Sequence, residues 1–163
     1  MLSKPHRASP VMRAATQPKA RQAARHFDKQ NQRSLALWAA GCAGHVLPFF
    51  EKKHPRDDRP RKAIEAGRAW AQGKIKCGEA RAAAVAAHAA ARDADEGAAR
   101  AAARAAGHAA GTAHMAGHAR HAAAYAVKAA AAAGIASAKE RGWQRRRLPA
   151  RHHTAAVSIS GVR

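Results

Sequence analysis

Residues 97–133 read GAARAAARAAGHAAGTAHMAGHARHAAAYAVKAAAAA, and this stretch decides the fold class. Alanine is the strongest helix former, because its side chain has no rotamer entropy to lose. Gly107, Gly111 and Gly117 punctuate the run. We therefore expect a break or kink near residues 114–117, leaving two antiparallel helices or one bent helix. A methyl group buries little apolar area, so such helices need close packing over many small contacts.

A first helix is predicted to begin near Ser34, because serine commonly caps helix N-termini. Apolar residues follow at steps of three and four, the spacing of one buried helix face: Leu35, Trp38, Cys42 and Val46. Pro48 should kink or end this helix. Gly41 and Gly44 weaken it, and we expect them to let another backbone approach closely.

Asp57 or Asp58 is expected to cap a second helix that has Pro60 in its first turn and stops at Gly73. Further helices are predicted over about 76–92 and 137–147. Aromatic residues make up 4% of the chain and β-branched residues are scarce, which disfavours strands. The sequence thus predicts an all-α fold, a compact bundle of about five to six alanine-rich helices with disordered basic tails. We expect a disordered arm over 1–32, the helical domain over 33–149 and a disordered tail over 150–163.

The formal net charge of +20 is unevenly distributed. Residues 1–27 carry six Lys and Arg residues and no acidic residue, and residues 139–163 are again strongly basic. Pro5, Pro10 and Pro18 break any long amphipathic helix in the first segment, so we interpret it as a disordered leader. Basic tails on a more balanced middle have nonspecific affinity for polyanions, so nucleic-acid binding through the tails is one functional hypothesis.

The sequence contains no recognisable catalytic motif. Cys42 and Cys77 form no CxxC pair, and we interpret both as reduced thiols of a cytoplasmic protein. No run approaches the roughly 18 apolar residues of a membrane span. Nucleophilic catalysis needs a nucleophile beside a base, and a phosphate loop needs glycines after a strand. Neither pattern is present, so we predict no catalytic residue, no cofactor and no membrane contact.

The histidines are the most distinctive feature. Four side chains recur at steps of four, three and four residues: His114, His118, His121 and Tyr125. This spacing places them on one face of a helix, while His88 and His108 lie elsewhere in the alanine-rich region. Histidines at i and i+4 can share a transition metal, but no glutamate lies between Gly97 and Lys139, so we predict no metal site. The alternatives are a polar seam, in which the rings hydrogen-bond to each other, to Tyr125 or to backbone carbonyls, and a binding surface.

A series of short segments runs through 33–149: LALWAA (35–40), HVLP (45–48) with Phe50 and Glu51, DRPRKAIEA (58–66), RAWA (68–71) with Gly73, EAR (79–81), AAHAAAR (86–92), AAG (105–107), TAH (112–114), GHA (117–119), YA (125–126), KA (128–129), WQ (143–144) and RLP (147–149). In this order and spacing they resemble a bacterial family of immunity proteins, the Imm-five-like group. The resemblance implies an all-α domain that neutralises a toxin made by the same or a neighbouring bacterium. The family supplies no established catalytic residues.

The leading hypothesis is therefore a cytoplasmic protein that neutralises a cognate toxin by stoichiometric binding rather than catalysis. Nonspecific nucleic-acid binding through the tails is the alternative. Aromatic, arginine and histidine side chains are the candidate contacts, because aromatic and arginine residues carry most interface energy. The candidate interaction surface comprises Arg61, Trp70, His88, His114, His118, His121, Tyr125 and Trp143.

Overall fold

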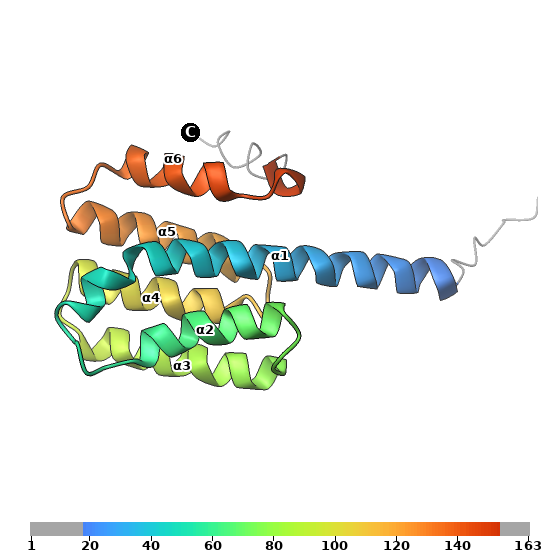
Figure 1. Cartoon of the computed structure of the whole chain (residues 1–163), viewed down its shortest axis with the longest axis horizontal. Coiled ribbons are helices and arrows are strands. Elements are labelled where there is room, and N and C mark those ends of the chain that lie inside the picture. The colour runs from blue at the N-terminus through green and yellow to red at the C-terminus, as the bar shows by residue number, and fades with distance from the viewer. Residues whose placement is uncertain (1–17, 154–163) are drawn as a thin grey trace, which may run out of the picture.

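The structure is a computed structural model that describes residues 18–153 (Figure 1). Within that range the elements are α1 (Pro18–Glu51), α2 (Arg59–Ala71), α3 (Cys77–Asp93), α4 (Ala98–Gly111), α5 (His118–Ala132), α6 (Ser137–Arg147) and the short 3-10 helix η1 (Ala150–His152). No strand occurs among these residues. The predicted all-α class is confirmed, and the predicted break in the alanine run is the turn between α4 and α5.

Helix α4 is the centre of the bundle, since it packs against α1, α2, α3 and α5. Nine of its 14 residues are alanine, and seven of these alanines are buried. The large apolar side chains of the core come from α1 and α2: Phe50 is 0% exposed and Val46 is 1% exposed on α1, and Ile64 on α2 is 2% exposed. Helix α6 lies beside α5 at one edge of the molecule, and α3 lies at the opposite edge (Figure 1).

The close approach of two backbones is at Gly67 rather than at the two glycines predicted for it. A Cβ atom placed on Gly67 would lie 3.3 Å from the carbonyl oxygen of Ala109, so α2 and α4 touch there. A Cβ atom on Gly41 would meet nothing within 4 Å, and one on Gly44 would meet only the Arg68 side chain. The prediction for Gly41 and Gly44 is therefore wrong.

The ends of α2 follow the predicted chemistry. Asp58 is the N-cap residue, while the Asp57 carboxylate accepts a hydrogen bond from the Arg59 amide at 3.1 Å. Gly73 has a φ of +75°, the left-handed conformation that stops a helix. The Lys74 amide then donates to the carbonyl of Ala69 at 2.9 Å, closing the last turn.

The first helix begins at Pro18, not near Ser34, so the disordered arm predicted over 1–32 is wrong for residues 18–32. Proline is tolerated at the first helical position because that amide needs no intrahelical partner. The Ala, Arg, Gln and Lys residues that follow are strong helix formers. The N-terminal turns of α1 project beyond the other helices (Figure 1). The described side chains between Arg21 and Gln30 are exposed. Helix α1 also continues past Pro48 to Glu51.

The folded domain also extends beyond residue 149, its predicted C-terminal boundary. Residues 150–152 form η1, and His152 Nε2 lies 3.4 Å from Ser34 Oγ on α1. The predicted tail from residue 150 is therefore wrong for its first residues, because they return to the bundle. The predictions for 1–17 and 154–163 lie outside the described residues. None of the helices in the described part of the chain has the length and apolarity needed to cross a membrane.

Candidate functional site

Five of the eight predicted contact residues gather at one place, the histidine cluster, which is formed by three elements and one turn. His88 comes from α3, His108 from α4, His118, His121 and Tyr125 from α5, and His114 from the turn before α5. The rings of His118, His121 and Tyr125 lie 5.1–5.3 Å from the His108 ring, and the His88 ring lies 4.9 Å from it. His108 is thus the hub of the cluster.

Two glycines of α4 make room for these rings. A Cβ atom on Gly107 would lie 2.7 Å from the His88 ring, and one on Gly111 would lie 3.2 Å from the His118 ring. Both glycines are buried. The glycines that the sequence presents as punctuation are therefore the places where imidazoles pack directly on the helix backbone.

The hydrogen bonds of the cluster require neutral histidines. His108 Nδ1 lies 2.9 Å from His118 Nδ1, so one of the two nitrogens must accept. Arg104 Nη1 donates to His88 Nδ1 at 3.3 Å, which requires that nitrogen to be unprotonated. The geometry matches the predicted polar seam for His88, His108 and His118, while His114 and His121 remain exposed.

Burial and neighbouring positive charge both act on these rings. Burial, reinforced by the neighbouring histidines and Arg104, lowers the pKa of His108 from 6.5 to about 4. The pKa values of His88 and His118 are also lowered, first by burial and then by basic neighbours. Among residues 18–153, no three His, Cys, Asp or Glu side chains are arranged to share a metal ion.

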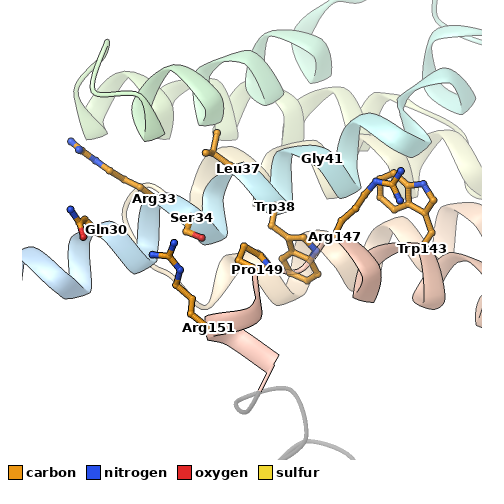
Figure 2. A pocket seen from close by; sticks show the side chains of 10 residues that line it. All are labelled: Gln30, Arg33, Ser34, Leu37, Trp38, Gly41, Trp143, Arg147, Pro149 and Arg151. Atoms are coloured by element: carbon orange, nitrogen blue, oxygen red, sulfur yellow. The ribbon is translucent and has the colours of Figure 1, made fainter.

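A second feature is the arginine groove, which runs between α1 and the segment from α6 to η1 (Figure 2). Its volume is about 680 Å³. The described residues that line it are Gln30, Arg33, Ser34, Leu37, Trp38, Gly41, Trp143, Arg147, Pro149 and Arg151. Three arginines and two tryptophans thus line one depression, and no acidic side chain is among these ten residues.

A buried polar network holds the groove in shape. Glu140 is 2% exposed and accepts hydrogen bonds from His45 Nδ1 at 2.8 Å and from Gln144 Nε2 at 3.0 Å. The His45 ring stacks on Trp143 at 3.9 Å, and the Trp38 indole donates to the Gln144 carbonyl at 2.9 Å. A buried carboxylate needs such partners, and here they fix both tryptophans between α1 and α6.

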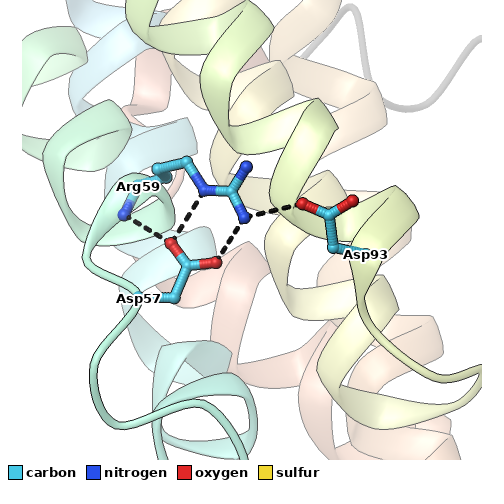
Figure 3. A network of polar contacts seen from close by, with 3 residues as sticks. All are labelled: Asp57, Arg59 and Asp93. Carbon is cyan, nitrogen blue, oxygen red and sulfur yellow. Dashed lines mark hydrogen bonds and ion pairs between the residues drawn. The ribbon is translucent and has the colours of Figure 1, made fainter.

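A third polar network joins the N-terminal end of α2 to the C-terminal end of α3. The Arg59 guanidinium bonds to Asp57 Oδ1 and Oδ2 at 2.9 and 2.6 Å and to Asp93 Oδ2 at 2.8 Å (Figure 3). The hydrogen bond from Arg59 lowers the pKa of Asp57. This network ties the start of α2 to the end of α3, and no groove residue takes part in it.

The remaining three predicted contacts are separated from the cluster. Arg61 is exposed and pairs with Glu51. Trp70 is 7% exposed and packs against Ala36, Ala80 and Ala113, so the prediction that it contacts a partner is corrected: its indole lies in the core. Trp143 lines the arginine groove.

Several residues that line the arginine groove are not among the contact residues predicted from the sequence. Arg33 and Arg151 lay in segments predicted to be boundary or tail, and Trp38 was assigned to the buried face. The one available signal was the spacing of Trp143 and Arg147, since i and i+4 side chains meet on a helix. The Arg147 guanidinium indeed lies 4.0 Å from the Trp143 ring.

Comparison with known proteins gives one match. The model of the family described as "Imm-5 like putative immunity protein" matches residues 25–151. No curated protein and no solved structure matches the chain. The matched range includes most of α1, all of α2 to α6 and most of η1. The chain therefore belongs to the Imm-5 like family of putative immunity proteins.

Proposed function

We propose that this protein neutralises a bacterial toxin by stoichiometric binding in the cytoplasm, and that it acts without catalysis. The observation that carries the proposal is the family match over residues 25–151, which covers almost the whole described bundle. An immunity protein acts on a protein partner, so the exposed surface of this bundle is the functional part of the molecule.

The side chains available on that surface support binding. The arginine groove presents tryptophan and arginine, the residue types that contribute most to protein interfaces. The two thiols are poor candidates for nucleophiles. Cys42 is fully buried, and burial raises its pKa to about 12. The Cys77 thiol donates to the Ala113 carbonyl at 3.4 Å and has no histidine among its hydrogen-bond partners in the described chain.

Polyanion binding through the tails gains no support from the comparisons. The acid-free segment 1–27 lies mostly outside the described residues. We therefore keep nucleic-acid binding as an outcome to be tested, not as a second proposal.

Coexpression tests the proposal. Full-length chain and the product of a neighbouring toxin gene are expressed together and separately in the same host. Growth should be restored only when the chain is present, and the two proteins should copurify through two columns in constant ratio. Growth arrest despite soluble, folded chain would contradict the proposed function.

A further inference from the structure

The arginine groove contains positive charges that no acidic side chain of the described chain neutralises. Arg33, Arg147 and Arg151 line it, and none of them has an acidic partner among the described residues. Arg33 Nε is buried and has no hydrogen-bond partner in the described chain. In Figure 2 Arg147 lies against Trp143 and Arg151 lies beside Pro149, while the Arg33 side chain extends from α1 away from both. Its Nη2 lies 3.6 Å from the position of a Cβ atom on Gly73, so Arg33 borders the groove on the side of α2. An unpaired guanidinium in a groove favours an anionic group, and a carboxylate can pair with it through two parallel hydrogen bonds.

The spacing of the arginines suits an extended segment better than a single small anion. Arg33 lies on α1, Arg147 ends α6 and Arg151 lies on η1. Apolar side chains separate the charges: Leu37, which is 46% exposed, Trp38 and Pro149. An occupant that matches the groove therefore has several negative charges with an apolar side chain among them.

The tryptophans argue against a nucleic-acid strand. Single-stranded nucleic acids stack their bases on free aromatic faces. The Trp143 ring is already covered by His45 at 3.9 Å and by Arg147 at 4.0 Å. The Trp38 indole is fixed by its hydrogen bond to the Gln144 carbonyl. Neither ring is an open platform, whereas the guanidinium groups remain available to carboxylates.

We propose that the arginine groove is the docking site for an acidic segment of the partner protein, whose Asp or Glu carboxylates pair with Arg33, Arg147 and Arg151. This inference rests on the proposed function, since it names the chemistry by which the toxin is recognised.

The test compares two double substitutions that change charge equally. R147E/R151E reverses two groove arginines, and R145E/R146E reverses two exposed arginines of α6 that do not line the groove. The probe is a capped hexaglutamate peptide, with binding to the full-length chain followed by fluorescence anisotropy. We expect R147E/R151E to weaken binding by about tenfold or more and R145E/R146E to weaken it by less than about threefold. Equal weakening by both variants would overturn the groove as the site.

Leu37→Glu provides an independent variant that leaves every arginine in place. Leu37 is exposed, so the substitution should not disturb the core, and the new carboxylate competes for the guanidinium groups. It should weaken hexaglutamate binding as R147E/R151E does, with an unchanged melting temperature. A folded Leu37→Glu protein with wild-type affinity contradicts the proposal.

Two further arms separate the alternatives. Hexathymidylate that binds more tightly than hexaglutamate, and loses that binding in R147E/R151E, would make the occupant a nucleic acid and overturn the acidic-segment proposal. In the coexpression assay, R147E/R151E should lose protection while R145E/R146E keeps it. Full protection by R147E/R151E overturns the groove inference alone, whereas failure of the wild-type chain overturns the proposed function.

Discussion

Acidification should destabilise this fold through the histidine cluster, and His108 is the residue at which to test it. Its ring meets His88 from α3 and His118, His121 and Tyr125 from α5, with Arg104 on its own helix. The ionisable neighbours that act on its charge are all basic. A proton on His108 must therefore be accommodated beside other positive groups in a half-buried site.

The pKa values give the sign and size of the effect. The pKa of His108 falls from 6.5 to about 4, so the unfolded chain binds more protons than the folded chain between these values. The stability due to neutral His108 is complete above pH 6.5 and is lost as the pH falls toward about 4. At about 1.4 kcal/mol per pKa unit the shift corresponds to about 3 kcal/mol. Since solvent screens a half-buried ring, we expect a loss of about 2 kcal/mol.

Urea unfolding followed by circular dichroism at pH 7.5, 6.5, 5.5 and 4.5 measures this loss. His108→Gln removes the titrating ring and should show a smaller decline in unfolding free energy, by about 2 kcal/mol over the range. His26→Gln, at an exposed position of α1 outside the cluster, is the control and should decline as the wild type does. An identical decline in His108→Gln and wild type would refute the reasoning.

Three further perturbations test the packing and the networks. Gly67→Val should lower the free energy of unfolding by about 1–3 kcal/mol, because its side chain forces α2 away from the Ala109 carbonyl. Gly41→Ala should raise it by up to about 1 kcal/mol, because the added Cβ atom meets nothing and alanine favours the helix. Urea midpoints that move in the same direction for both variants would contradict this. A thiol reagent at pH 8 should modify one cysteine of the native protein rapidly, Cys77, and reach the buried Cys42 only after unfolding; two fast thiols would show that the core is open. Asp93→Asn should lower the free energy of unfolding by less than about 1 kcal/mol, because Asp93 is 67% exposed. Asp57→Ala should lower it by about 1–2 kcal/mol, because it also removes the hydrogen bond to the Arg59 amide. Equal losses in thermal unfolding would contradict the larger role given to Asp57.

Elements with local signals could be predicted from the sequence. Pro60 and Gly73 bound α2, and Gly111 and Gly117 flank the turn between α4 and α5, which the sequence predicts near 114–117. These signals act within a few residues, so no knowledge of the tertiary structure is needed. The start of α1 was missed because Pro18 was interpreted as a helix breaker, although proline is compatible with a first helical position.

The candidate site depended on pairings that no local signal reveals. His118, His121 and Tyr125 were correctly grouped by their spacing on α5, but His114 lies in the preceding turn, and His108 reaches them only because α4 and α5 pack together. Arg33 and Arg147 both line the arginine groove, although most of the chain lies between them in the sequence. Glu140 stands among basic residues near the C-terminus of the sequence, and nothing local predicts that its side chain is 2% exposed and hydrogen-bonded to His45 of α1.

The central claim is that protection comes from one-to-one binding. Purified toxin, encoded by a neighbouring gene, is titrated with the full-length chain, and residual toxin activity is measured after short and long incubation. The account predicts a linear fall that reaches zero at one equivalent, identical at both times, with a complex of one copy of each protein by native mass spectrometry. Complete inactivation by a few hundredths of an equivalent, increasing with time, would contradict it by showing that the chain acts on the toxin as a catalyst.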